Sequence, residues 1–374
     1  MLRNLAACLA LLLSGAALAA APQPPVVDAR AWLLLDATSG QSIASRNPQE
    51  RIEPASLTKL MTAYLAFGAL KGRSLALGQT IRVSERAWHA SGSRMFIEPR
   101  KPVTVEELLH GLIIQSGNDA SIALAEAVAG SEPAFVERMN REAGRLGMTD
   151  TNFTNSSGMP GPGHYSTARD LALITSALIR EYPEYYKLYS EREYRYNDIT
   201  QRNRNQLLWL DPNVDGVKTG HTESAGYSLI ASAQRSGRRL VSVVIGATSE
   251  NLRARESQKL LNFGFQSYDT LRLYQKGDAI GKLQVWKGSK RELKAGAAAD
   301  LYVTVPKGAA DALQAELVSQ QPLIAPVEAG QRVAMLRVSH AGKPLTEYPV
   351  IALESVAVAG FFARAWDSIR LWFE

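Results

Sequence analysis

The chain has 374 residues, of which 46% are apolar and 21% are charged, and its formal net charge is +6. This length favours two domains with an appendage, and this composition favours a globular protein with a sizeable core. The moderate positive charge selects no partner by itself, and nucleic-acid binding is not expected because the sequence has neither a compact basic run nor alternating basic and aromatic residues.

Residues 1–20 have the three parts of a cleaved secretory signal: a positive charge at Arg3, an apolar stretch over 5–13, and small residues at 17–19. The apolar stretch is too short to be a permanent membrane-spanning helix. Cys8 is the one cysteine of the chain, so the exported part would hold no disulfide and no catalytic thiol. These features predict a bacterial envelope protein located outside the cytoplasm.

Residues 26–267 are expected to form an α+β domain. Alternating and apolar runs predict strands at 31–35, 41–46, 226–236 and 239–247, with a weaker strand at 78–83. Helical periodicity predicts helices at 54–67, 105–115, 120–129, 133–146, 167–180 and 251–265. Residues 84–102 and 149–165 are expected to be irregular, 211–224 to be rich in turns, and 182–204 is left unassigned. Because strands occur near both ends, we expect one antiparallel sheet built from both termini of the domain.

Composition changes near residue 268. Short β-like runs punctuated by Gly and Pro follow at 280–285, 301–305, 333–338 and 350–353. We predict a small β-sandwich domain over residues 268–355.

The last segment, 356–374, predicts an amphipathic helix. At helical spacing, its aromatic and aliphatic residues fall on one arc of roughly 140°, with Leu371 as the exception, and its charged residues fall on the other side. One interpretation is a helix docked on its own β domain. We favour a peripheral membrane anchor, because Trp and Phe on a charged amphipathic helix are typical of a membrane interface.

The stretch Pro54–Phe67 carries the first candidate for chemistry. Pro54 favours a helix start, which would place Ser56 at the N-terminus and Lys59 one turn later on the same face. The residues around Lys59 are apolar, so its ammonium would be costly to bury. A serine beside such a lysine indicates an activated nucleophile with a proton acceptor, although chance alone would give a Ser-x-x-Lys about once in a chain of this size.

Two further motifs follow the first in the chain, and three such motifs in this order are much less expected by chance than the first motif alone. The three are Ser56-Leu57-Thr58-Lys59, Ser116-Gly117-Asn118 and Lys218-Thr219-Gly220. With these three motifs, the chain resembles the serine penicillin-binding proteins and β-lactamases. More closely, nearly the whole chain resembles the penicillin-binding protein 5/6 type of D-alanyl-D-alanine carboxypeptidase. The resemblance includes the stretches 55–59, 115–120, 165–170, 203–205 and 214–222, the β domain and the amphipathic tail.

The resemblance implies a reaction. Ser56 would attack the carbonyl between two D-alanines of a peptidoglycan stem peptide, forming an acyl-enzyme and releasing the terminal D-alanine. Lys59 would accept the proton, with burial and the cation Lys218 both favouring its neutral form. Ser116 would relay the proton toward the leaving amine, polarised by Lys218, and Asn118 would hold Lys59 and the substrate amide.

The remaining residues implied by the resemblance bind substrate. The backbone N–H groups of Ser56 and His221 would form the oxyanion hole, next to Gly220. Thr219, with Arg204 and Arg253, would receive the substrate carboxylate, although ordinary surface charge is the alternative for the two arginines. β-Lactam antibiotics would acylate Ser56 covalently.

Two rival functions remain open. A class A β-lactamase has a Glu after the second motif that activates the deacylating water, but residues 149–167 contain Asp150 and no Glu. A catalytically inactive scaffold that binds peptidoglycan is the other rival, and the intact Ser56, Lys59 and Lys218 argue against it. The five histidines show no metal-ligand spacing, and no cofactor is expected.

Overall fold

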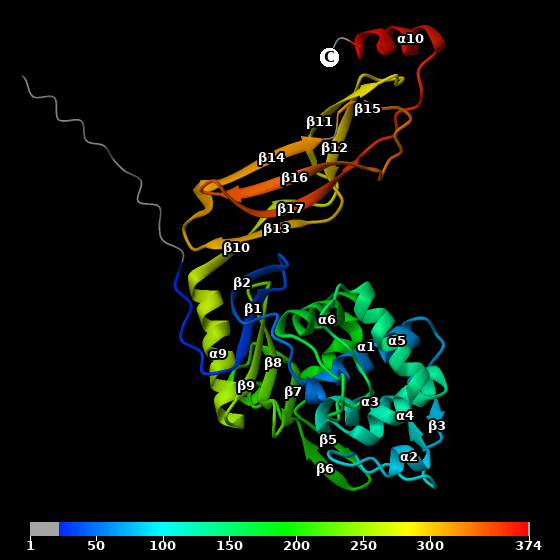
Figure 1. Cartoon of the computed structure of the whole chain (residues 1–374), viewed down its shortest axis with the longest axis vertical. Helices are drawn as coiled ribbons and strands as arrows, with labels where there is room; N and C mark the ends of the chain where they lie inside the picture. The colour runs from blue at the N-terminus through cyan, green and yellow to red at the C-terminus, as the bar shows by residue number, and fades with distance from the viewer. Residues whose placement is uncertain (1–21, 320, 373–374) are drawn as a thin grey trace, which may run out of the picture. The chain divides into compact units, whose positions relative to one another are not determined.

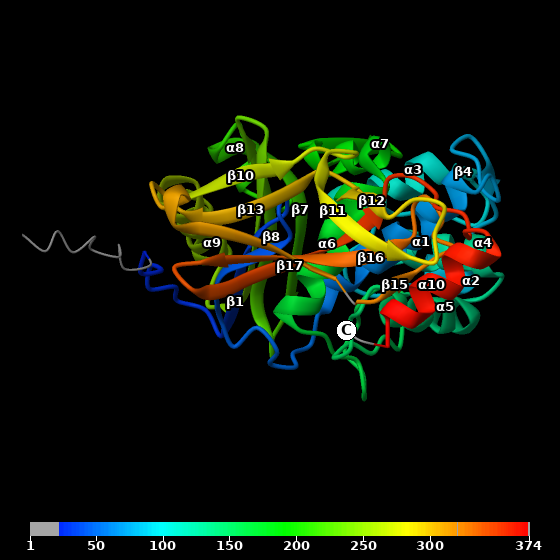
Figure 2. The ribbon, with the colours of Figure 1, turned by 90° about the horizontal axis from the view of Figure 1, so that it is seen from above.

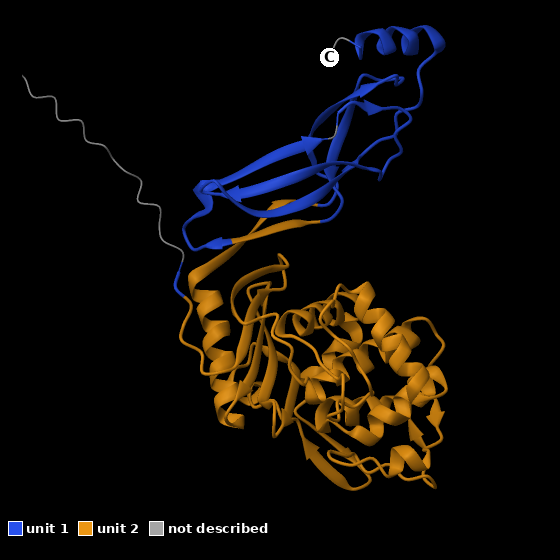
Figure 3. Ribbon diagram, viewed as in Figure 1, with its two compact units in different colours: residues 1–23, 276–299, 305–374 blue, residues 24–275, 300–304 orange. Residues whose placement is uncertain are grey.

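The computed structural model describes residues 22–319 and 321–372, so the predicted signal segment lies outside the described residues. The chain forms two compact units (Figure 3). The N-terminal unit comprises residues 24–275 and 300–304, and the C-terminal unit comprises residues 276–299 and the chain from 305 onward.

The N-terminal unit is built around one five-stranded antiparallel sheet with the order β2-β1-β9-β8-β7 (Figure 1). Its strands are β1 (Ala31–Asp36), β2 (Gln41–Arg46), β7 (Val214–Thr222), β8 (Gly226–Arg235) and β9 (Arg238–Ala247). The predicted sheet drawn from both ends of the domain is therefore confirmed.

Helices cover both faces of this sheet, which places β9 between two apolar clusters. The helical elements of the unit are η1 (Ala55–Thr58), α1 (Lys59–Lys71), α2 (Glu85–Trp88), α3 (Val105–His110), η2 (Gly111–Gln115), α4 (Asn118–Ala129), α5 (Glu132–Arg145), α6 (Ala168–Glu181), α7 (Pro183–Tyr186), η3 (Lys187–Ser190), α8 (Leu207–Leu210) and α9 (Glu250–Ser267). Val243 of β9 is buried in the cluster that contains α6, whereas Val244 is buried against α9. This follows from the alternation of side chains along a strand.

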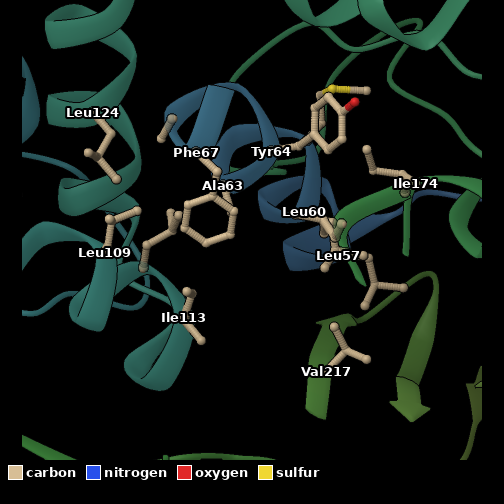
Figure 4. Close-up of a cluster of buried hydrophobic side chains, with 14 of the residues drawn as sticks. Leu57, Leu60, Ala63, Tyr64, Phe67, Leu109, Ile113, Leu124, Ile174 and Val217 are labelled. Atoms are coloured by element: carbon tan, nitrogen blue, oxygen red, sulfur yellow. The ribbon is translucent and has the colours of Figure 1, made fainter. Parts of the chain in front are cut away.

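Helix α1 lies at the centre of the larger cluster. Leu60, Ala63 and Phe67 are each fully buried, and Figure 4 shows them meeting side chains from α3, α4 and α6. An apolar helix surrounded in this way has little freedom to move because the interior is close-packed. The residues just before and at its start, Ser56 and Lys59, are therefore held in place.

The prediction that 211–224 is rich in turns is wrong, because most of it forms β7. The glycines there allow close packing rather than turns. A Cβ at Gly216 would lie 2.6 Å from the hydroxyl oxygen of Tyr186, and a Cβ at Gly220 would lie 3.1 Å from both Leu57 Cγ and the Pro54 carbonyl oxygen. Absence of a side chain at Gly220 thus lets β7 approach η1.

Smaller strands complete the unit. They are β3 (Thr80–Ile81), β4 (Val103–Thr104), β5 (Glu193–Tyr196), β6 (Ile199–Arg202) and β10 (Tyr268–Tyr274), which pairs with β13 (Leu301–Pro306). The segment 182–204, which the sequence left unassigned, forms α7, η3 and the hairpin of β5 and β6.

The C-terminal unit is mainly β-structure, as predicted. Its six-stranded sheet has the order β14-β16-β17-β12-β11-β15. The elements are β11 (Ala279–Trp286), β12 (Glu292–Ala297), η4 (Ala310–Ala312), β14 (Leu313–Ser319), β15 (Leu323–Ile324), β16 (Arg332–His340), β17 (Lys343–Ala352) and α10 (Phe361–Arg370). Among the described residues, no helix combines the length and the apolar character needed to cross a membrane.

Candidate active site

Ser56 and Lys59 lie at the junction of two helical elements. Ser56 belongs to the 3-10 turn η1, and α1 begins at Lys59, where the sequence predicted one continuous helix from Pro54. Ala55, just before the serine, has a positive φ of 48°. The tight turn still leaves the two side chains on one face, with Lys59 Nζ 3.1 Å from Ser56 Oγ.

Lys59 is buried, with 1% of its surface exposed. Its pKa is lowered to about 7, first by burial and then by the nearby cation Arg204, while the carboxylate of Asp119 opposes the shift. The sequence assigned the cationic contribution to Lys218. In the structure, it is Arg204 that acts on Lys59, whereas the repulsion between the two lysines lowers the pKa of Lys218.

The contacts of Lys59 Nζ fix which way its lone pair points. Nζ donates to Asn118 Oδ1 at 2.6 Å and to the Ser157 carbonyl oxygen at 2.6 Å, and both of these atoms can only accept. A neutral amine has two N–H groups and one lone pair. With both N–H groups engaged, the lone pair is directed at the third neighbour, the hydroxyl of Ser56.

Ser116 and Lys218 form a second hydrogen-bonded pair. Ser116 ends η2 with a left-handed φ of 67°, which turns its side chain out of the helix line. Lys218 Nζ, on β7, lies 2.8 Å from Ser116 Oγ and 3.0 Å from the Thr219 carbonyl oxygen. Lys218 is also buried, and its pKa is lowered well below the usual value, first by burial and then by Lys59, Arg204 and Arg253.

Asn118 is held from three directions. Its backbone N–H donates to the Ser93 carbonyl at 2.7 Å, its Nδ2 donates to the Ser91 carbonyl at 2.7 Å, and its Oδ1 accepts from Lys59. The donor contact of Nδ2 fixes which end of the amide faces the lysine. Segment 89–97, predicted only as irregular, thus orients the second motif.

Asp119 fixes that segment in turn, although no role was predicted for this residue. Its buried carboxylate accepts the backbone N–H groups of Met95, Phe96 and Ile97 at 3.0, 2.8 and 3.3 Å. In the sequence, only its position beside Asn118 could have indicated this role. The backbone acceptors of Ser91, Ser93 and Ser157 could not be predicted from sequence, since every residue has a carbonyl group.

The third motif lines the same site along β7. Thr219 is buried at 6% exposure, and Gly220 packs against η1. The side chain of His221 is exposed and lies against the ring of Tyr227, with centroids 4.0 Å apart. The contacts of Lys59 with Ser56 and Asn118, and of Lys218 with Ser116, therefore bring all three motifs together, whereas the ring of His221 packs on Tyr227.

The two arginines differ in burial. Arg204 is exposed, whereas Arg253 is 2% exposed, with Nη1 3.4 Å from the Gly220 carbonyl oxygen and Nη2 3.3 Å from Glu250. Burial and the charge of Arg204 lower the pKa of Arg253. The surface-charge interpretation is therefore wrong for Arg253. The two like charges therefore act on each other unfavourably.

Two family models match the chain. Residues 18–249 match the model described as D-alanyl-D-alanine carboxypeptidase, and residues 268–358 match the C-terminal domain of penicillin-binding protein 5. The first match covers more than half of the chain. The chain belongs to the D-alanyl-D-alanine carboxypeptidase family.

Two relatives can be aligned with this carboxypeptidase over nearly its full length. The D-alanyl-D-alanine carboxypeptidase DacC of Escherichia coli is 43% identical over 94% of this chain and 90% of its own length. The crystal structure of penicillin-binding protein 5 from Haemophilus influenzae superposes with a TM-score of 0.85 at 39% identity, covering 90% of this chain and 99% of that one. Penicillin-binding protein D2 of Listeria monocytogenes, solved in an ampicillin-bound form, has a TM-score of 0.60 at 30% identity and covers 65% of this chain and 100% of its own.

The loop over 149–167 of this carboxypeptidase is rigidly built. Asn155 Oδ1 accepts backbone N–H groups from Ser157, Gly158 and Met159 at 3.2, 2.7 and 3.1 Å, which presents the Ser157 carbonyl to Lys59. His164 Nδ1 accepts from the Thr154 N–H at 3.0 Å, so its Nε2–H faces the Thr58 hydroxyl at 2.8 Å. Burial lowers the pKa of His164 to about 4, and the ring is a neutral structural bridge between the loop and η1.

Metal-assisted chemistry was not predicted for this site. Within residues 22–319 and 321–372, no three His, Cys, Asp or Glu side chains gather as a metal site would require.

Proposed function

We propose that Ser56 is the nucleophile of a D-alanyl-D-alanine carboxypeptidase that removes the terminal D-alanine from peptidoglycan stem peptides. The observation that carries this is the geometry of Lys59, whose Nζ lies 3.1 Å from Ser56 Oγ and whose pKa is lowered to about 7. With this pKa a substantial fraction of Lys59 is neutral near neutral pH, and the neutral amine can take the serine proton as a general base.

Acylation then proceeds at the junction of η1, β7 and α4. As Lys59 takes the proton, Ser56 Oγ bonds to the carbonyl carbon, and the backbone N–H groups of Ser56 and His221 stabilise the oxyanion. Ser116, 2.8 Å from Lys218 Nζ, relays this proton from Lys59 to the leaving amine of D-alanine as the C–N bond breaks, which returns Lys59 to its neutral form. Water later hydrolyses the ester and restores the Ser56 hydroxyl.

Substrate binding uses the rest of the site. The C-terminal carboxylate of the stem peptide is received by Thr219 with Arg204 and Arg253, because these supply a hydroxyl and two guanidinium groups at one end of β7. Burial of Arg253 supports this, since a buried cation with one partly exposed carboxylate 3.3 Å away gains from a further anion. Asn118 holds the peptide amide as well as Lys59.

Labelling with fluorescent penicillin tests the nucleophile, because a β-lactam acylates the same serine. The wild type is expected to retain the label through denaturation, and Ser56→Ala is expected to lose it. Lys59→Arg should also lose labelling, since an arginine side chain stays protonated, while Lys71→Arg at the exposed end of α1 should label normally. Full labelling of Ser56→Ala would refute the assignment.

Release of free D-alanine separates this function from an inactive peptidoglycan-binding scaffold. A peptide that ends in D-Ala-D-Ala should lose its last residue with the wild type and not with Ser56→Ala. A protein that binds peptidoglycan and releases no D-alanine would support the scaffold instead.

The rate of deacylation separates it from a β-lactamase. Asp150 is the only acidic residue of the 149–167 loop, and it is bound to Arg51 at 2.9 Å. Without a free carboxylate in the loop to activate water, the penicilloyl adduct is expected to persist after excess penicillin is removed. Rapid turnover of penicillin would assign a β-lactamase.

The second part of the proposal is attachment of the exported enzyme to the outer face of the cytoplasmic membrane by α10. Phe362 of α10 and Trp372 just after it are 87% and 91% exposed, so none of the described residues covers this apolar face. A helix whose apolar face were docked on its own domain would not leave these side chains in water. Truncation after Ser355 is expected to release the enzyme from membranes, and unchanged membrane association would contradict the anchor.

A further inference from the structure

Large apolar side chains are exposed at one end of the C-terminal unit. Among its described residues, the large apolar side chains that are exposed are Ile324, Val358, Phe361, Phe362, Trp366, Ile369 and Trp372. We call these seven residues the apolar patch. Five of them lie on α10 or directly after it, but Ile324 belongs to β15 and Val358 to the segment that leads into the helix.

Helix α10 is fixed to the unit through its polar face. The Asp367 carboxylate accepts the backbone N–H of Lys287 at 2.7 Å, and the guanidinium of Arg370 lies 5.4 Å from the ring centre of Trp286. At about 100° per residue, Asp367 points away from the middle of the aromatic arc. Asp367, Ser368 and Leu371 are the least exposed residues of the segment, which explains why Leu371 is the one apolar residue outside the arc.

Three consecutive residues at the end of β11 position all parts of the patch. Trp286 pairs with Ile324 of β15, the Lys287 N–H binds Asp367 of α10, and Gly288 bridges to Val358. Figures 1 and 2 show β15 and α10 next to each other at this end of the unit. The helix and the β15 tip therefore form one surface on one support.

The positive charges near the apolar patch indicate what kind of surface it binds. Arg364 and Arg370 lie on α10, and Lys287, Lys290 and Arg291 lie in the segment between β11 and β12, which contacts Asp367 and Val358 through residues 287 and 288. Two described carboxylates beside these cations are engaged, Glu354 with Lys290 and Asp367 with the Lys287 N–H. Aromatic residues with surrounding cations match an anionic lipid surface, where rings sit among the headgroups and each nearby cation adds attraction.

We infer that the membrane contact of this enzyme is a composite, rigid footprint in which the β15 tip inserts beside α10, so that the C-terminal unit is held in a fixed orientation on the bilayer. This rests on the proposed membrane attachment. It differs from a simple tether, in which α10 alone would enter the lipid and the β structure would remain free in water.

Ile324 provides the test, because it is remote from α10 in sequence. In a Cys8→Ala background, Ile324→Cys gives a single thiol for an environment-sensitive dye. Bound to vesicles of phosphatidylglycerol and phosphatidylethanolamine, the full chain is expected to show a blue shift of the dye and quenching by lipids that carry a nitroxide in the acyl chain. The matched control is Ile199→Cys in the N-terminal unit, where the native side chain is 41% exposed against 46% for Ile324. The dye at position 199 should show neither the blue shift nor the quenching, because it should remain in water.

Two variants separate a rigid footprint from a tether. Ile324→Glu should weaken vesicle binding by about threefold to tenfold, from the loss of a partly buried aliphatic side chain, while Ile199→Glu should bind as the wild type does. Asp367→Ala should reduce quenching at position 324 but leave a dye at Trp366→Cys quenched, because the helix would still bind lipid after leaving its support.

The outcomes are distinct. Vesicle binding with the dye at 324 in water, and with Ile324→Glu bound as tightly as the wild type, would overturn the composite footprint and leave the anchor intact. Failure of the full chain to bind these vesicles at all would overturn both proposals.

Discussion

Lys59 acquires its proposed chemical role from its neighbours rather than from its side-chain type. Two acceptors that cannot donate occupy its N–H groups, and the third contact is the hydroxyl of Ser56. Its pKa of about 7 reflects burial first, then the cation Arg204, with Asp119 in opposition. Each of these neighbours can be changed separately.

Acylation by a β-lactam should therefore depend on pH. Only the neutral form of Lys59 accepts a proton, so the acylation rate constant should rise about tenfold per pH unit below about pH 7 and level off above it. Arg204→Gln removes a cation that favours the neutral form, so its midpoint should move to higher pH. Stopped-flow acylation across pH measures this. The control Arg202→Gln, at an exposed position two residues away, should keep the wild-type midpoint, and an unmoved midpoint in Arg204→Gln would contradict the assignment.

Asp119→Asn should act on both stability and pH dependence. An amide group would face the N–H groups of Phe96 and Ile97, at a cost of about 1–3 kcal/mol in unfolding free energy. Since the Asp119 charge raises the pKa of Lys59, its removal should move the acylation midpoint to lower pH, opposite to Arg204→Gln. Urea denaturation and the pH profile check the two effects. Asp198→Asn, 93% exposed, is the control and should change neither.

The residues of the site could be predicted from sequence where side-chain chemistry is distinctive. Ser56, Lys59, Ser116 and Lys218 stand in short motifs, and the structure brings these four together across some 160 residues of chain, from 56 to 218. The Ser157 carbonyl could not be predicted, because backbone acceptors are set by loop conformation. The effect of Arg204 on Lys59 depends on distance through space, which sequence spacing does not give.

At the scale of elements, the long helices and the strands β1, β2, β8 and β9 followed from the sequence pattern, but the edge strand β7 did not. A strand with glycines at 216 and 220 looks like a turn, since glycine is typical of turns and weakens strands. The structure shows a different cause: Gly216 and Gly220 lie where Tyr186 and η1 leave no room for a Cβ. Such crowding arises only from tertiary packing, so the local pattern was misleading.

Gly220→Ala tests this packing. The new Cβ would lie 3.1 Å from Leu57 Cγ and from the Pro54 carbonyl oxygen, so η1, which carries Ser56, must shift by a few tenths of an ångström. We expect the acylation rate to fall about tenfold, because small misplacements of a nucleophile are costly. Gly78→Ala is the matched control, since a Cβ there meets nothing within 4 Å, and it should acylate normally. Wild-type acylation by a folded Gly220→Ala would show that the contact has no bearing on the nucleophile.

At the scale of the whole molecule, the division of the chain differs from a simple succession of segments. The N-terminal unit is discontinuous in sequence: it comprises residues 24–275 and also residues 300–304. Asp36 of β1 is the reason, since its fully buried carboxylate accepts from Arg238 at 2.8 Å, from Thr304 at 2.9 Å, and from Thr270. Two of these three donors lie beyond residue 267, where we predicted the catalytic domain to end.

Thr304→Val should therefore destabilise the N-terminal unit, although position 304 is far along the chain from the active site. Valine keeps the shape of threonine but removes a donor to a buried carboxylate, at a cost of about 1–3 kcal/mol in unfolding free energy. Denaturant unfolding followed by loss of penicillin labelling measures this in the unit that holds Ser56, and the exposed Thr200→Val is the control. A chain ending at Ser267 loses the donors of both Thr270 and Thr304, so it should be less stable than Thr304→Val. Equal stability of that truncation and the wild type would place the boundary at 267 and leave Arg238 as sufficient partner for Asp36.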